Sequence, residues 1–150
     1  MTPALEYLRT LAPAAGPLGL VILLYDTLLR DCGRAREAAM AGEVEKRSAE
    51  VGHALLVLQE LQGRLDPSAG EPARQLEQFY AAMRALLLEA SLQDSPALFQ
   101  QAIANVTSVR AAWSEAEQKL ARDAPDASRP AQRSSPQLQE ASEEASQWSA

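Results

Sequence analysis

The run Pro17-Leu18-Gly19-Leu20-Val21-Ile22-Leu23-Leu24-Tyr25-Asp26 decides how this chain folds. Pro17 suits the first turn of a helix, where its missing N–H would have no partner. The apolar residues 20–24 cover the whole circumference of a helix, whereas a helix facing one core needs apolar residues at about three positions in seven. The run is too short to span a bilayer, which needs about 20 apolar residues. It therefore predicts a helix start that is buried on nearly every side, in a core or beneath a partner.

The composition predicts a single helical domain. The chain has 150 residues, of which 47% are apolar and 5% aromatic, and its net charge is −6. An acidic chain without a basic stripe does not fit a nucleic-acid or anionic membrane surface.

The single cysteine, Cys32, excludes an internal disulfide and is interpreted as a small buried hydrophobe. No signal peptide is expected, because the N-terminus lacks a basic region and a long apolar stretch, and a reducing cytoplasm is the expected location.

The pattern along the chain predicts three regions. Residues 1–16 form an N-terminal arm, with a short helix from Ala4 to Leu11 that is broken by Ala12-Pro13-Ala14-Ala15-Gly16-Pro17. Residues 17–122 form four helices joined by short loops, which predicts an all-α, antiparallel, up-down four-helix bundle. Residues 123–150 are rich in Ser, Pro and Glu and are expected to be disordered, because they have too few large apolar residues to offset the entropy of ordering.

Each predicted helix carries one apolar stripe with steps of three and four residues. The first helix should run from about Pro17 to Ala41 and end at Gly42, and the second should begin near Glu43. The third should begin at Glu71-Pro72, and Asp94 or Ser95 should cap the fourth. The expected stripes are Val21, Leu24, Tyr25, Leu28, Cys32, Ala35 and Ala39; Val51, Ala54, Leu55, Leu58, Leu61 and Leu65; Leu76, Phe79, Tyr80, Met83, Leu86, Leu87 and Ala90; and Phe99, Ala102, Ile103, Val106, Val109, Trp113, Ala116 and Leu120.

The motif Pro-x-x-Leu-(apolar)3-Leu-Tyr-Asp from Pro17 to Asp26 resembles the first long helix of the FliS family, the flagellin export chaperones. Tyr7 lies ten residues before Pro17, like the family's N-terminal tyrosine. Further similar segments follow in the same order over roughly residues 4–120. They are Ala35 to Lys46 at the first helix–helix turn, Gly70-Glu71, Phe79-Tyr80-x-x-Met83 and Leu88-Glu89-Ala90 in the third helix, and Arg110-Ala111-Ala112-Trp113 in the last helix.

The resemblance implies a cytoplasmic chaperone that binds the disordered C-terminal segment of flagellin, prevents its premature polymerisation and delivers it to the flagellar type III export apparatus. A component of the export gate is then a second partner, and a co-chaperone is a third. No cofactor, metal, nucleic acid or membrane insertion is expected. The arm is expected to cover a client groove until the client arrives. The expected partner-binding residues are Tyr7, Leu8, Leu20, Leu23, Leu24, Tyr25, Asp26, Phe79, Tyr80 and Met83, although Phe79, Tyr80 and Trp113, taken singly, fit a core better than a groove.

The only histidine, His53, raises two alternatives. The stretch Glu50-Val51-Gly52-His53 has the Glu-x-x-His spacing of di-iron bundles, but those need the motif on two helices. An exposed histidine on a four-helix bundle also fits a phosphotransfer module, although a solvated surface histidine is the simpler interpretation. No Ser/His/Asp or Cys/His arrangement suggests an enzyme.

Two further alternatives concern binding. One is an adaptor for another exported subunit. The other is a structural homodimer that uses the surface around Leu20 to Leu24.

Overall fold

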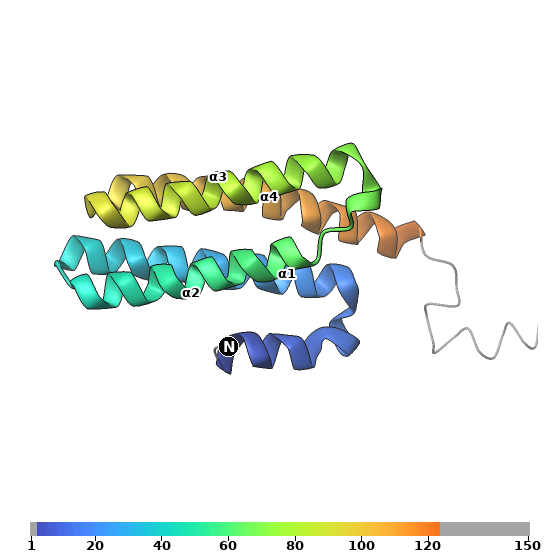
Figure 1. The fold of residues 1–150 in the computed structure, drawn as a ribbon. Helices are drawn as coiled ribbons and strands as arrows, with labels where there is room; N and C mark the ends of the chain where they lie inside the picture. Colours follow the sequence, from blue (N-terminus) through green and yellow to red (C-terminus); the bar gives the residue numbers. More distant parts are fainter. Residues whose placement is uncertain (1–2, 124–150) are drawn as a thin grey trace, which may run out of the picture. The chain divides into compact units, whose positions relative to one another are not determined.

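The structure is a computed structural model that describes the backbone of residues 3–123 and the side chains of residues 18–123. Its elements are α1 (Pro3–Ala41), α2 (Val44–Gly63), the short 3-10 helix η1 (Pro67–Ala69), α3 (Glu71–Gln93) and α4 (Pro96–Asp123). The long helices run alternately up and down (Figure 1), and the described residues contain no strand. These features confirm the predicted all-α, antiparallel four-helix bundle. The described part of the chain divides into two units after Ser114.

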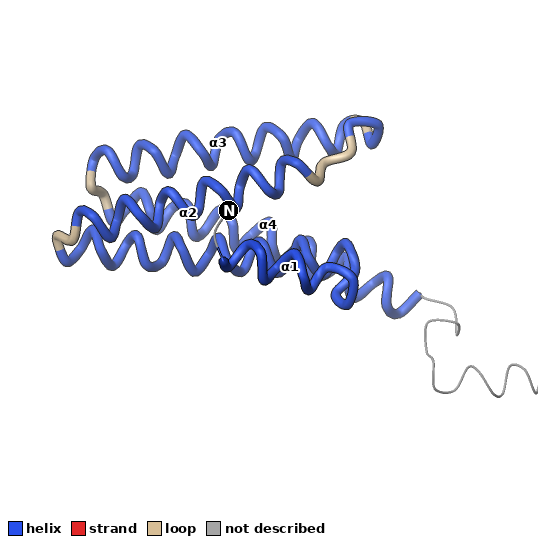
Figure 2. Tube along the Cα trace, turned by 60° about the horizontal axis from the view of Figure 1, so that its bottom comes forward, coloured by secondary structure: helices blue, strands red, loops and turns tan. Residues whose placement is uncertain are grey.

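The beginning of α1 differs from the prediction of a separate arm helix. The helix is continuous from Pro3 to Ala41, with no break at residues 12–16. Its first part nevertheless turns back and runs antiparallel to the long remainder (Figures 1 and 2). Pro13 and Pro17 lie in this region, and a proline inside a helix removes a hydrogen bond and clashes with the preceding turn. The predicted break in helical structure at residues 12–16 is therefore wrong, although the chain changes direction within α1.

The turns at one end of the bundle follow from their residues. Gly42 has a φ of +74°, a conformation that glycine adopts without steric cost, and it ends α1 as predicted. Asp94 is left-handed, with φ 53° and ψ 47°, and therefore ends α3. Ser95 caps α4, because its Oγ accepts a hydrogen bond from the backbone N–H of Leu98 at 3.1 Å. Of the two expected caps, Ser95 is thus the one that is used.

The core lies between the four helices and largely follows the predicted stripes. Ala116 and Leu120 are corrections, since both are exposed and Leu120 is 62% accessible. Val57 is fully buried although the predicted stripe omitted it. The main core cluster consists of Leu20, Leu24, Tyr25, Leu28, Cys32, Ala35, Ala39, Val51, Ala54, Val57, Leu58, Leu61, Tyr80, Met83, Leu87, Ala90, Phe99, Ala102 and Val106.

Two further sequence-based predictions concern membrane insertion and the C-terminal residues. No helix within residues 3–123 is both long and apolar enough to cross a membrane. The expected disorder of residues 123–150 concerns a segment that, apart from Asp123, lies outside the described residues.

Candidate functional site

The apolar run in α1 is enclosed, as its composition predicts. Leu20 and Leu24 are each 1% exposed, and Ile22 is buried as well. Val21 and Leu23 are partly buried and pack against the core cluster. The run is therefore largely enclosed, as predicted, but it lies inside α1 and does not begin the helix.

Five of the predicted partner-binding residues are buried in this structure. Leu20, Leu24, Tyr25, Tyr80 and Met83 belong to the core cluster, with exposures of 1% or less. The reason is that the α1 run and the aromatic segment of α3 both contribute to one interhelical core, so these side chains are already used for folding. Their role in partner binding remains a prediction.

The other predicted site residues lie nearer the surface or outside the described side chains. Leu23 and Phe79 are partly buried, and the side chain of Asp26 is 41% exposed. Tyr7 and Leu8 lie in the first part of α1, whose side chains are outside the described set. Their expected contact with the α1 run remains a prediction.

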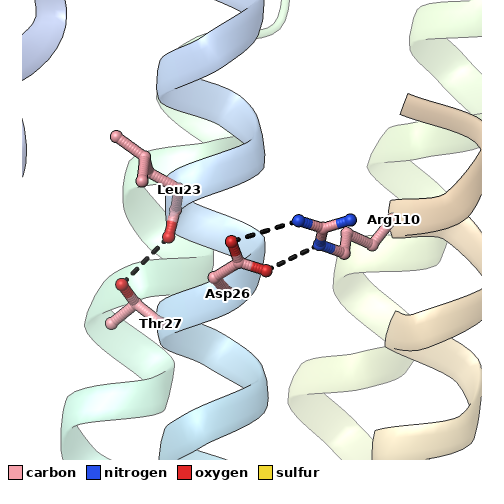
Figure 3. A network of polar contacts seen from close by, with 4 residues as sticks. All are labelled: Leu23, Asp26, Thr27 and Arg110. Carbon is pink, nitrogen blue, oxygen red and sulfur yellow. Dashed lines mark hydrogen bonds and ion pairs between the residues drawn. The ribbon is translucent and has the colours of Figure 1, made fainter. Parts of the chain in front are cut away.

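Asp26 connects α1 to α4 through an ion pair with Arg110 (Figure 3). The guanidinium donates through Nε to Oδ1 at 2.6 Å and through a terminal nitrogen to Oδ2 at 3.2 Å. The hydroxyl of the next residue, Thr27, donates to the carbonyl of Leu23 one turn earlier at 3.0 Å, which satisfies a buried polar side chain. The bidentate geometry fixes the orientation of two helices, but the exposure of both partners limits the contribution of the pair to stability.

A second polar contact joins α1 to α3 inside the core. The hydroxyls of Tyr25 and Tyr80 are 2.9 Å apart, and both residues are almost fully buried. The Tyr25 ring also lies against Trp113 of α4, with ring centroids 6.3 Å apart. Burial raises the pKa of both phenols, so both remain neutral and able to share a hydrogen bond at ordinary pH.

His53 is not the solvated surface histidine of the simpler sequence-based interpretation. Its side chain is 19% exposed and its Nδ1 contacts Oδ2 of Asp31, a carboxylate that is only 4% exposed. Burial is the main reason that the pKa of Asp31 is raised above its usual value. His53 is held there because Asp31 of α1 lies on the edge of the face that α2 covers. A histidine held in this way is poorly placed for phosphotransfer.

A groove with a volume of about 470 Å³ lies between α3 and α4. Phe79 and Met83 were predicted to bind a partner, and both line it, Phe79 partly buried and Met83 almost fully buried. The other lining residues were not predicted from the sequence. The signal for them was their spacing, since they recur on one face of each helix. They are Ala82 and Leu86 of α3 and Gln101, Asn105 and Ser108 of α4.

Neither a metal site nor a reactive thiol emerges from this arrangement. No group of three or more potential metal ligands occurs in the described part of the chain. Cys32 is fully buried, and burial raises the pKa of its thiol to about 12, so it carries little of the thiolate that makes a cysteine reactive.

Comparison with known proteins gives one family. The family model described as "Flagellar protein FliS" matches residues 1–120, which is most of the chain. No curated protein matches the chain significantly.

Proposed function

The chain belongs to the FliS family of flagellar export chaperones, and from this premise we propose that it binds the disordered C-terminal segment of flagellin in the cytoplasm. It thereby prevents premature polymerisation and delivers flagellin to the type III export apparatus, where it meets a component of the export gate. The family match over residues 1–120 carries this proposal. The helical bundle and the open groove on its surface support it, because both suit recognition of a helical segment.

The physical basis is the cost of leaving the client segment free. A disordered segment whose apolar stripes pack inside the filament would self-associate if it were left free. A bundle that orders it as amphipathic helices keeps these stripes covered. Ordering such a segment costs about 2–5 kcal/mol of the gross interaction energy. The contact must therefore be extensive, while the net affinity stays low enough for release at the export gate.

The N-terminal part of the chain is proposed to regulate access to the bundle. Tyr7 and Leu8 would cover the surface next to Leu20, Leu24 and Tyr25 in the free protein and move when the client binds. The reversed direction of the first part of α1 supports this idea, because it brings this segment back along the helix (Figure 1). Since Leu20, Leu24 and Tyr25 are buried, their own contact with a client requires such a movement.

Tyr7→Glu tests the covering role. A charged side chain at this position should not pack against an apolar surface. The change should therefore alter client affinity without altering the helical content of the bundle. Unchanged affinity would remove the N-terminal segment from the mechanism.

Co-expression with flagellin tests the function itself. Flagellin encoded by the same genome should co-elute with the chain in size exclusion, and flagellin lacking its C-terminal segment should not. The chain should also stop elongation of flagellin filaments from seeds at a near-equimolar ratio. Co-elution with the truncated flagellin at full yield would refute the proposed mode of recognition. Co-elution with a different exported flagellar subunit alone would favour the adaptor alternative.

A further inference from the structure

Asp31 carries a charge at a position where a charge is costly. Among residues 18–123 it is the only charged residue that is buried, and Leu28 and Cys32, on either side of it in α1, are fully buried. An ionised carboxylate loses hydration when it is buried, and this cost is offset only by partners that supply opposite charge or hydrogen bonds. The free energy of the contact between α1 and α2 therefore depends on the groups that face Asp31.

A titratable partner faces Asp31 across the helix pair, namely His53 of α2. The Nδ1 atom of His53 contacts Oδ2 of Asp31, and histidine is the side chain whose charge ordinarily changes between about pH 5 and pH 8. A protonated imidazole supplies both a hydrogen bond and the opposite charge. A neutral imidazole with its proton on Nδ1 keeps the hydrogen bond but supplies no full counter-charge. The loss of one proton therefore weakens this contact without removing it.

The described charged groups around Asp31 do not replace the lost charge. Burial is the main reason that the pKa of Asp31 is raised, and the contact with His53 is the main effect that opposes it. Glu50 of α2 adds to the rise, because it is a like charge. Arg30 of α1 opposes the rise, but it is exposed, and water and salt screen an exposed charge. The protonation of the pair thus controls the electrostatic free energy at this point of the helix contact.

We propose that Asp31 and His53 form a proton-dependent latch between α1 and α2, which is tight in mildly acidic solution and loosens as the pH rises through neutrality. Because the two side chains are in contact, they titrate as a pair. In mildly acidic solution the pair holds one more proton and is an ion pair, and above neutrality an ionised carboxylate lies beside a neutral ring. The latch is a property of the bundle itself, so it goes beyond the proposed chaperone function and does not depend on it.

Cys32 reports on this latch from the adjacent position in α1. Its side chain is fully buried. Burial, and to a smaller extent the charge of Asp31, raises the pKa of its thiol to about 12. The thiol therefore reacts with a reagent in solution when α1 opens locally. Since Cys32 is the only cysteine in the chain, the labelling rate of the full-length protein measures opening at this one position.

The pH dependence of this labelling tests the latch. At each pH, the rate with a disulfide reagent in denaturant is divided by the rate in the native chain, which cancels the pH dependence of the thiol in the unfolded chain and gives a protection factor. One proton changes an opening equilibrium by at most about tenfold per pH unit. We expect the protection factor of the wild-type chain to fall at least about threefold between about pH 6 and pH 8. A constant protection factor over this range would overturn the proposal.

Three variants identify the groups responsible. Asp31→Asn removes the buried charge and should abolish the fall. His53→Gln keeps an amide donor but no titratable ring, so its protection factor in mildly acidic solution should match that of the wild-type chain above neutrality. Asp94→Asn is the matched control, because it removes a different ion pair of α2, with Arg47 at 2.6 Å, whose members do not ordinarily change charge in this range. It should retain the full fall, whereas a full fall in Asp31→Asn would overturn the proposal.

The reversed first part of α1 supplies a second control. Its charged side chains belong to Glu6 and Arg9 and lie outside the described set. Glu6→Gln and Arg9→Gln should each retain the fall, and its loss in either variant would assign the sensor to this segment and overturn the proposal. Circular dichroism should show the same helical content in all five variants.

Nuclear magnetic resonance of the ring of His53 gives an independent measurement that needs no variant. His53 is the only histidine in the chain, so its ring signals are unambiguous. The decline in Cys32 protection should level off at the pH at which this ring has lost its proton, because the latch has no further proton to release in this range. Titration of the ring with no accompanying change in protection would show that its charge does not control the contact.

Discussion

Removing the hydroxyls of Tyr25 and Tyr80 should show that α1 and α3 are coupled through one buried hydrogen bond. The two oxygens lie 2.9 Å apart, and the residues are 0% and 1% exposed. Tyr25→Phe leaves the Tyr80 hydroxyl buried without this partner, and Tyr80→Phe does the same to Tyr25. An unsatisfied buried hydroxyl costs about 1–3 kcal/mol. Each single change should therefore lower the free energy of unfolding by that amount, out of a total of about 5–15 kcal/mol for a domain.

The double variant separates the hydrogen bond from other effects of the substitutions. In the double variant both hydroxyls are absent, so neither is left unsatisfied. The double variant should therefore lose less unfolding free energy than the sum of the two single losses, by about 1 kcal/mol or more. Urea unfolding followed by far-UV circular dichroism measures all four free energies. Unchanged m-values show that the same surface is exposed in each case. Strictly additive losses would refute the argument that these hydroxyls stabilise each other.

Three further predictions concern single residues. Because the pKa of Asp31 is raised above 3.8, the folded chain holds a proton that the unfolded chain releases as pH rises past about 4. The contribution of protonated Asp31 to the free energy of unfolding is therefore lost as the pH rises from about 4 to the raised pKa, by at most about 1.4 kcal/mol per pH unit. Asp31→Asn should remove this dependence, and an unchanged pH profile of urea unfolding would contradict it. Cys32 should react with a disulfide reagent about a thousandfold more slowly in the native chain than in denaturant, since burial raises the pKa of its thiol to about 12; fast native labelling would show that α1 is not packed as described. Asp26→Asn should cost less than about 1 kcal/mol in urea unfolding, because its pair with Arg110 is partly exposed, and a larger loss would assign this ion pair a dominant structural role.

The fold could be predicted from the sequence because each helix carries a regular apolar stripe and is bounded by residues with clear local preferences. Gly42 ends α1 and Ser95 caps α4, as predicted. The continuity of α1 through Pro13 and Pro17 was not predicted, because a proline pattern does not distinguish a bent helix from a broken one.

The candidate site was less predictable because helical periodicity shows which face is apolar but not what covers it. Leu20 and Tyr80 have the character of a binding surface, yet the neighbouring helices bury both. The contact between Asp31 and His53 depends on the register of α1 against α2, which neither helix reveals alone. For the same reason, Ala82 and Asn105 resemble ordinary surface residues until the structure places α3 beside α4.

Titration calorimetry of the full-length chain with flagellin from the same genome, with and without the flagellin C-terminal segment, tests the central claim most directly. The intact flagellin should bind saturably with a negative heat-capacity change, because apolar surface is buried as the segment becomes ordered. The truncated flagellin should give no binding heat. Equal affinity for both forms would contradict the claim that this chain recognises flagellin through its C-terminal segment.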